Sequence, residues 1–177
     1  MASPQAREFP VAPLQPMVWP IAILLTIVLP LAITAAVVFG SQQRPLPGAA
    51  MATLLGVLLL TALVLAMLGR RRITLENGML VVAAAFYTRK APVASLDLAH
   101  ARIASLDERT EFRPGLKTNG YGLPGFQAGH FRLRNRAKAF CLLTGQQRVL
   151  ILPQQDGAFL LLSPEQPQAL LDALRAA

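Results

Sequence analysis

Two long apolar segments without a charge constrain this chain more than any other feature of its sequence. They are Met17–Phe39, MVWPIAILLTIVLPLAITAAVVF, and Ala49–Leu68, AAMATLLGVLLLTALVLAML. A bilayer core of roughly 30 Å needs about 20 helical residues, and backbone groups cannot remain unpaired in lipid, so both segments predict transmembrane helices. The alternatives are core helices of a soluble protein and, for the first segment, a cleaved signal peptide. Core helices of soluble proteins seldom run this long without a charged residue. The apolar core of a signal peptide spans only about 7–15 residues, which is shorter than the first segment.

The composition agrees with a membrane protein. Hydrophobic residues make up 54% of the 177 residues and charged residues 15%, whereas soluble domains carry about 25% charged residues. This composition excludes an intrinsically disordered chain. The single cysteine, Cys141, excludes an internal disulfide and a multi-thiolate zinc site, and two histidines, His100 and His130, leave little for a histidine-rich metal site. We therefore expect no metal and no cofactor.

The connection between the two segments, Gly40–Gly48, is short and polar. A connection of this length predicts antiparallel neighbours, that is, a helical hairpin with both chain ends on one side. Arg and Lys residues accumulate on the cytoplasmic side of membrane helices. Arg70, Arg71 and Arg72 directly follow the second segment, whereas the connection holds only Arg44. We therefore expect both termini in the cytoplasm; the alternative is a basic linker without topological meaning.

Two further features predict how the hairpin helices pack. Pro30 lies in the middle of the first segment and cannot donate to the carbonyl of Thr26, so we expect a kink there. Small residues recur four apart near the outer ends of both helices, at Ala32, Ala36, Gly40, Ala52 and Gly56. Such spacing lets helix backbones approach closely. The alternative is chance, because alanine is abundant in both segments.

The residues after the hairpin predict a separate, mainly β domain. Glu76–Gly78 is a turn signal, and Phe131–Arg136 alternates between apolar and basic residues, as in a strand with one buried face. Short turns at 145–147 and 156–157 separate further apolar runs, which predicts antiparallel sheets. The expected strands are 73–75, 79–87, 131–136, 138–144, 148–152 and 158–163.

The chain is expected to end in one helix. Ser163 is a suitable N-cap, Pro164 suits the first helical position, and Gln166 completes a Ser-x-x-Gln capping box. Leu170, Leu171 and Leu174 form a narrow apolar stripe, which predicts that this helix docks on the sheets.

At this point the sequence resembles a known family. Lys117–Asn135, KTNGYGLPGFQAGHFRLRN, is followed by AFCLLT, RVLIL and DGAFLLLSPEQPQALLDALR. This pattern is similar to the bacterial PH-like (pleckstrin-homology-like) domain family, in the branch found in small membrane proteins, over roughly Ile73–Ala177. The resemblance implies two packed antiparallel sheets of about seven strands, capped by a C-terminal helix, and it implies no catalytic residues. Eukaryotic relatives often bind phosphoinositides through basic residues of an early hairpin, but this region offers only Arg89 and Lys90, so that activity is not transferred.

The expected fold class is a two-helix transmembrane hairpin followed by a mainly β PH-like domain. The expected division is a cytoplasmic tail over 1–16, a hairpin over 17–69 with helices at 17–39 and 49–69, a basic juxtamembrane linker over 70–72, and the PH-like domain over 73–177.

A glycine-rich stretch is the first candidate for a functional element. Its residues are Lys117, Asn119, Gly120, Gly122 and Gly125. Glycine permits close backbone approach, so this stretch is interpreted as a loop whose amides meet an anion or a partner strand. The spacing does not match a P-loop or a dinucleotide-binding fingerprint. The alternative is a shaped structural loop or a β-bulge.

A basic strand face is the second candidate. Arg132, Arg134 and Arg136 alternate with apolar residues, and Lys138 follows in register if the strand continues. Near a membrane such a face attracts anionic lipid headgroups, and it could also receive an acidic partner. The alternative is a solvated outer face. Nucleic acid is not expected as a partner, because aromatic residues are scarce and the basic face is short.

No pattern of residues predicts an enzyme. Asp107, Glu108 and Glu111 are grouped with Arg109 and Arg113, but they lie in an expected loop without a nearby nucleophile or metal ligand. The function that we expect is a non-enzymatic module of the bacterial inner membrane, which tethers, assembles or regulates a membrane complex through a protein partner or self-association. The alternative function is an accessory subunit of a transporter or secretion system.

Overall fold

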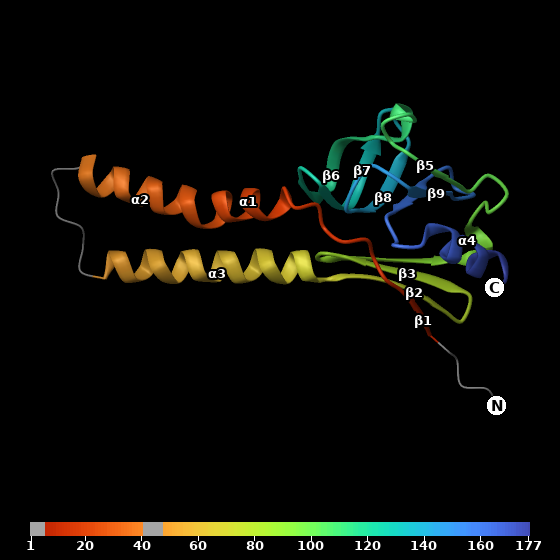
Figure 1. The fold of residues 1–177 in the computed structure, drawn as a ribbon, viewed down its shortest axis with the longest axis horizontal. Helices are drawn as coiled ribbons and strands as arrows, with labels where there is room; N and C mark the ends of the chain where they lie inside the picture. Colours follow the sequence, from red (N-terminus) through yellow and green to blue (C-terminus); the bar gives the residue numbers. More distant parts are fainter. Residues whose placement is uncertain (1–5, 41–47) are drawn as a thin grey trace.

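The computed structural model describes residues 6–40 and 48–177, and it consists of two helices that extend from one end of a β domain (Figure 1). The first helical segment comprises α1 (Val18–Ile23), a π-helical turn (Leu24–Val28) and α2 (Leu29–Gly40). The second is α3 (Ala49–Gly69). Residues 41–47 of the expected connection, including Arg44, lie outside the described residues.

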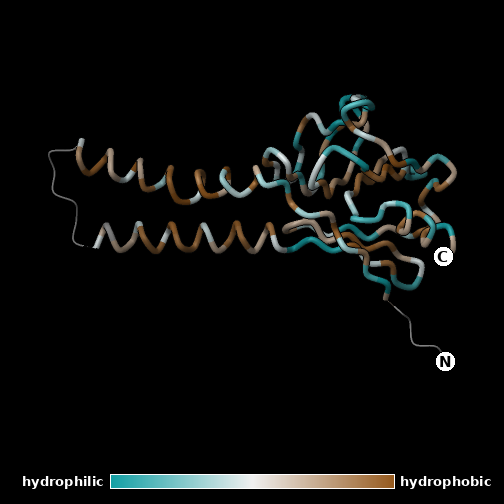
Figure 2. The backbone as a smooth tube through the Cα atoms, viewed as in Figure 1, coloured by the Kyte–Doolittle hydropathy of each residue, from teal (hydrophilic) through white to brown (hydrophobic). Residues whose placement is uncertain are grey.

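Both helical segments are long and apolar enough to cross a bilayer, and they indicate membrane association. They span Val18–Gly40 and Met51–Gly69. In the most apolar 18-residue stretch of each segment, only 11% and 17% of the residues, respectively, are buried. Figure 2 shows hydrophobic residues along nearly the whole length of both helices. A core helix of a soluble protein would be mostly buried, so the exposure of so much apolar surface favours lipid as the surrounding medium.

The irregularity expected near Pro30 takes the form of the π-helical turn that precedes it. The N–H of Leu29 donates to the carbonyl of Leu24, five residues earlier. Pro30 has no N–H, and a wider turn before it relieves the contact between its ring and the preceding carbonyls. Thr26, which is buried, donates its hydroxyl to the carbonyl of Ala22 at 2.7 Å.

The small residues do not bring the two helices together, contrary to the expectation. Ala32, Ala36, Ala52 and Gly56 are exposed, and a Cβ built on Gly56 meets no atom within 4 Å. The buried residues of the hairpin instead lie near the domain, and α2, which the structure describes completely, has none. They are Val18, Ala22, Thr26, Val64, Met67 and Leu68. Helix contact is therefore greatest near the domain, where larger side chains fill the interface together with Ala22.

This geometry predicts that Ala36→Leu combined with Gly56→Leu leaves the hairpin intact. Both positions are exposed, so disulfide cross-linking between cysteine pairs at the outer helix ends should stay within about twofold of the parent. Ala22→Leu, in the buried contact near the domain, is the matched change that should alter cross-linking. Reduced cross-linking in the Ala36/Gly56 variant alone would contradict this placement.

The β domain contains two packed sheets and a C-terminal helix, as expected. The first sheet has the order β1-β2-β3-β4 and the second the order β5-β9-β10-β8-β7-β6. The strands are β1 (Arg7–Phe9), β2 (Arg71–Glu76), β3 (Met79–Ala84), β4 (Tyr87–Pro92), β5 (Arg102–Ala104), β6 (Pro114–Leu123), β7 (Phe126–Leu133), β8 (Lys138–Leu143), β9 (Val149–Pro153) and β10 (Phe159–Leu162). The pairs are antiparallel except β8–β10, which is parallel and was not expected.

The main core lies between the two sheets and under α4 (Pro167–Arg175). A smaller core covers the outer face of the second sheet, where Phe112, from a 3₁₀ turn, packs on Phe159. Strands β8, β9 and β10 are therefore buried on both faces, which explains why their sequences are continuous apolar runs rather than alternating ones.

Two segments that were expected to lie outside the domain contribute to its first sheet. Arg71 and Arg72 are the first residues of β2 rather than a linker, and Arg7–Phe9 of the expected tail forms β1, which pairs with β2. The N-terminal segment continues along the domain, since the N–H of Ala12 donates to the carbonyl of Ser163 at 2.9 Å. The segments before and after the hairpin therefore lie at the same end of it (Figure 1).

This contact also explains why the expected capping box is wrong. Helix α4 begins at Pro167 with Gln166 in the N-cap position, and no side chain caps it. Ser163 is buried, its N–H donates to the carbonyl of Leu142, and the N–H of Glu165 donates to the carbonyl of Pro10. The segment that was expected to start the helix is thus held in extended contact with β8 and the N-terminal segment.

Candidate functional site

The glycine-rich stretch is a strand, not the loop that the sequence predicted. Lys117, Asn119, Gly120 and Gly122 belong to β6, which pairs with β7 through two register shifts, as the β-bulge alternative suggested. Gly120 lies directly opposite Gly129, whose φ is +108°. A Cβ on Gly129 would meet the Cα of Gly120 at 2.7 Å, so these glycines allow the two strands to approach closely.

The other residues of this stretch have structural contacts or face solvent. The side-chain carbonyl of Asn119 accepts a hydrogen bond from the hydroxyl of Tyr87 at 2.8 Å, which joins β6 to β4. Gly125 has a φ of +84° in the β6–β7 turn and lies against Gln15 and Val18. The turn therefore touches the chain where it enters the first helix. Lys117 is exposed.

The basic residues do not form a single strand face, which corrects the second sequence interpretation. Strand β7 ends at Leu133, so Arg134 and Arg136 lie in the β7–β8 turn, with Arg136 at a φ of +67°. The Asn135 side chain accepts a hydrogen bond from the N–H of Ala137 and stabilises this turn. Arg132 and Lys138 face each other across the β7–β8 pair. The four residues thus divide into a turn pair, Arg134 and Arg136, and a strand pair, Arg132 and Lys138.

The strand pair lines a cavity of about 390 Å³ at the flank of the domain, between the two sheets. Residues of opposite strands in direct register share a face, so Arg132 and Lys138 lie on the face that Ala128, Phe140 and Leu142 present to the main core. Across the cavity, β4 contributes Arg89 and β9 is followed by Gln154. The lining residues are Arg89, Thr118, His130, Phe131, Arg132, Lys138, Ala139, Phe140, Gln154, Asp156 and Ala158.

The inner part of this cavity holds polar atoms without partners. Arg89 Nη2 donates to the side-chain carbonyl of Gln154 at 3.5 Å, but Arg89 Nε is buried and has no hydrogen-bond partner among the described residues. His130 Nδ1 is likewise buried and unpartnered within the described part of the chain. The His130 ring is fixed by edge-on contacts with Tyr87 and Phe140, at ring-centre distances of 6.1 and 5.1 Å.

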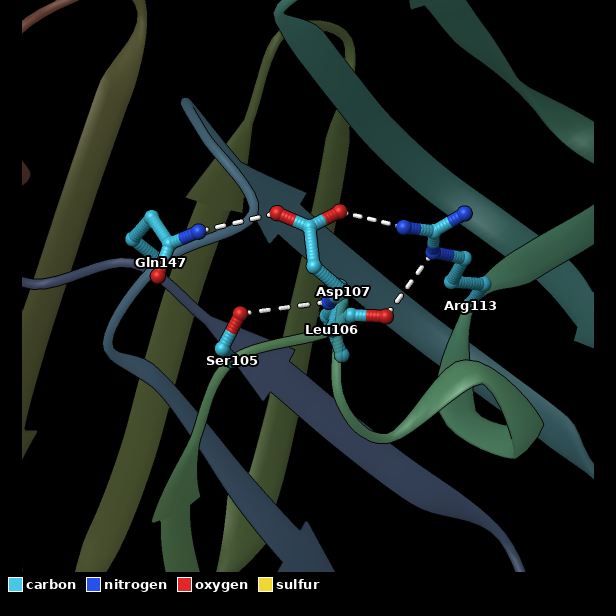
Figure 3. A network of polar contacts seen from close by, with 5 residues as sticks. All are labelled: Ser105, Leu106, Asp107, Arg113 and Gln147. Atoms are coloured by element: carbon cyan, nitrogen blue, oxygen red, sulfur yellow. Dashed lines mark hydrogen bonds and ion pairs between the residues drawn. The ribbon is translucent and has the colours of Figure 1, made fainter.

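A second, more open cavity of about 750 Å³ lies beside the β6–β7 turn. Asp107 is one of its lining residues, and Figure 3 shows how its carboxylate is held. It accepts hydrogen bonds from Arg113 and from Gln147 Nε2, the latter at 2.8 Å, and Arg113 Nε donates to the carbonyl of Leu106 at 2.8 Å. The network joins the β5–β6 connection to the β8–β9 turn, so Asp107 acts here as a structural ion-pair partner.

Two further titratable groups, the Cys141 thiol and the Asp97 carboxyl, have structural surroundings. Burial raises the pKa of the Cys141 thiol far above its ordinary value, so the thiol stays protonated and unreactive. His100 is exposed and bonds Asp97 at 2.7 Å, which lowers the pKa of that carboxyl. Within residues 6–40 and 48–177, no group of three or more His, Cys, Asp or Glu side chains could hold a metal ion.

The arginine triplet is tied into the fold at the end of α3. Arg70 Nη2 donates to the hydroxyl of Thr88 at 3.2 Å, and Arg71 Nη1 donates to the carbonyl of Ala12 at 3.4 Å. Arg72 forms an exposed ion pair with Glu8 of β1, at 3.0 Å. These contacts link β1, β2 and β4 at the end of the domain from which α3 extends.

A family model described as "Bacterial PH domain" matches residues 71–177. No curated protein and no solved structure matches the chain. The matched region begins at the first residue of β2, so of the strands in residues 6–40 and 48–177 it covers all except β1.

Proposed function

Because the chain belongs to the bacterial PH domain family, we propose that it is a membrane-anchored, non-enzymatic binding module. In this proposal the hairpin crosses the bacterial inner membrane, and the domain holds a partner at its cytoplasmic face in order to tether, assemble or regulate a membrane complex.

The observation that carries the proposal is the direct passage of α3 into β2. The N–H of Arg70 donates to the carbonyl of Ala66 in the last turn of α3, and the N–H of Ala85 in the β3–β4 turn donates to the carbonyl of Arg70. Strand β2 begins at the next residue, Arg71. With no linker between helix and sheet, the domain has a fixed position relative to the hairpin. A fixed domain suits a module that presents one surface to a partner.

The residues at this junction support its position at a membrane surface. Phe86 in the β3–β4 turn is 55% exposed and Trp19 near the start of α1 is 46% exposed. Aromatic residues are enriched at the membrane interface, and arginines on its cytoplasmic side. Both aromatic side chains lie at the domain end of the hairpin, as Arg70 does, so this end matches the cytoplasmic interface.

The position of the turn pair, Arg134 and Arg136, favours an acidic protein partner over the bilayer. The β6–β7 turn lies beside the start of α1, whereas the β7–β8 turn lies at the other end of these strands (Figure 1). Both arginines are exposed. Positive charge at this end of the domain is accessible to an acidic surface from the cytoplasm.

The second candidate function is an accessory subunit of a transporter or secretion system. The specific observation in its favour is that Ala32, Ala36, Ala52 and Gly56 face outward from the hairpin. Small residues at helical spacing on a lipid-facing surface permit another membrane helix to approach closely.

Affinity purification of the full chain from mild detergent, read by mass spectrometry, distinguishes these functions. A partner of the domain should be lost when Arg134→Glu is combined with Arg136→Glu, and should be retained in the matched variant Arg175→Glu on α4. A transporter partner of the hairpin should remain with a chain of residues 17–69 alone. If no protein is enriched over that hairpin control, the proposed tether function is wrong.

A further inference from the structure

Strand β6 offers an unpaired edge on the side of the domain that faces the hairpin. It ends the second sheet, and among the strands of residues 6–40 and 48–177 it pairs with β7 alone. Most of its residues are exposed. In Figure 1, β6 is the strand of this sheet nearest to the hairpin, and β7 and β8 lie farther away. Such an edge presents backbone donors and acceptors with which another extended chain can pair.

The stretch Asn119–Leu123 is the part of this edge that is open to pairing. Proteins protect edge strands by short length, proline, charged side chains and bulges. Strands β1 and β5 have three residues each, and β4 carries two basic residues and a terminal proline. The first half of β6 has Pro114, Lys117 and both register shifts. From Asn119 to Leu123 the register with β7 is regular, and none of these protective features is present.

The free backbone groups of this stretch belong to two glycines. Leu123 and Phe126 flank a two-residue turn, so they form a hydrogen-bonded pair. Hydrogen-bonded and non-hydrogen-bonded pairs alternate along an antiparallel ladder, so the N–H and C=O groups of Gly122 and Gly120 point away from β7. A Cβ on Gly122 would come no closer than 4.0 Å to a neighbouring atom. Another backbone can therefore approach this edge closely.

The open cavity of about 750 Å³ lies next to this edge, with Lys117 and Gly122 among its lining residues. Side chains alternate between the two faces of a strand, so every second side chain of an added strand would lie over this cavity. Its other walls carry amide groups that can both donate and accept, from Gln15, Gln127, Gln146 and Gln147.

The charges around this cavity favour an acidic side chain from the added strand. The carboxylate of Asp107 is already held by Arg113 and by a glutamine amide. In the part of the chain that the structure describes, no carboxylate lies within ion-pair distance of Lys117. An acidic residue that reaches Lys117 would therefore complement the site.

We infer that β6 binds an extended juxtamembrane segment of another membrane protein, which adds as a strand to Asn119–Leu123 and places an acidic side chain near Lys117. The inference rests on the proposed function, because it specifies the partner that the domain holds. The β6–β7 turn lies against Gln15 and Val18, where the first helix begins, so the segment would run close to the membrane surface. Two copies of this chain in one membrane would both direct this edge toward the bilayer, so pairing between copies is disfavoured.

Photo-cross-linking of the full chain in its native membranes tests this inference. The probe is p-benzoylphenylalanine in place of Leu116, which is 67% exposed on β6, and the control is the same probe in place of Arg175 on α4. The β6 probe should form an adduct with a protein, and mass spectrometry should place the linked residue directly beside a membrane-spanning segment of that protein. The inference is overturned if the adduct is absent, or if it forms only with lipid, with a second copy, with a sequence remote from a membrane helix, or equally from the α4 probe.

Gly122→Pro tests the pairing itself, because proline removes an N–H that points away from β7. Gly122→Ala keeps this N–H, so its adduct from the β6 probe should exceed that of Gly122→Pro by about fivefold or more. The thermal midpoints of the two variants should be similar, since an edge strand tolerates proline where its N–H faces outward. Equal adducts, or a much lower midpoint for Gly122→Pro alone, would overturn the inference.

The same variant separates this inference from the proposed function. If affinity purification enriches a partner of the domain and Gly122→Pro retains that partner in full, strand addition is wrong while the tether function stands. If the purification enriches no partner of the domain, the tether function itself is wrong, and this inference fails with it.

Discussion

Replacing Gly129 with alanine should unfold the β6–β7 pair and lower the thermal midpoint of the domain by about 15 °C. A Cβ at this position would meet the Cα of Gly120 at 2.7 Å and the carbonyl oxygen of Asn119 at 2.8 Å. It would also hold a non-glycine residue at a φ of +108°. Strain of this kind costs about 1–3 kcal/mol, and overpacking costs about the same again. A loss of about 4 kcal/mol in the free energy of unfolding corresponds to that shift in a domain of this size.

The control for this prediction is Gly122→Ala, two residues beyond Gly120 on the same strand. A Cβ on Gly122 comes no closer than 4.0 Å to any neighbouring atom, and its φ is not positive. Its thermal midpoint should stay within about 3 °C of the parent, measured by circular dichroism of the full chain in detergent. Equal effects of the two substitutions would show that close approach at Gly129 does not hold the strands together.

Phe126→Ala should have the second large effect, because Phe126 is 1% exposed at the start of β7 and its ring lies 6.1 Å from that of Tyr121. Truncation of a buried phenylalanine costs about 3–5 kcal/mol through lost burial and the remaining cavity. Leu116→Ala is the matched apolar truncation on β6, where the side chain is 67% exposed. It should change the free energy of unfolding by no more than about 0.5 kcal/mol. Similar losses in both variants, measured by chemical denaturation, would refute this assignment of the core.

Periodicity and run length were enough to predict the hairpin helices, strands β2, β3, β8, β9 and β10, the end of β7 and the terminal helix, but not β4, β5 or β6. Each of those signals is local: charge-free length for the helices, and apolar runs between turn residues for β8, β9 and β10. The family resemblance added the packing of two sheets, which strand patterns alone do not specify. The confirmed part of the fold is thus the part encoded by neighbouring residues.

The features that the sequence could not predict depend on contacts between distant segments. Strand β1 is only three residues long, and its partner β2 begins more than 60 positions later. Ser163 was expected to cap a helix, but its carbonyl accepts the N–H of Ala12 instead. A capping motif gives a local preference, which a long-range pairing can override.

The residues that line the cavity between the sheets were also only partly predictable from the sequence. Arg132 and Lys138 could be selected from their charge, but their separation from Arg134 and Arg136 depends on where β7 ends. Asn135 between the arginines was the available turn signal. Arg89 approaches the strand pair only because the two sheets pack together, and no sequence spacing indicates that contact.

We propose that the hairpin crosses the inner membrane and fixes the PH domain at its cytoplasmic face. Paired reporter fusions test it most directly, with one fluorescent protein that folds only in the cytoplasm at Ala177 and one phosphatase that is active only in the periplasm within residues 41–47. The arginine triplet after α3 predicts fluorescence from the first fusion and phosphatase activity from the second. Phosphatase activity from a fusion at Ala177, or fluorescence from the loop position, would contradict the account.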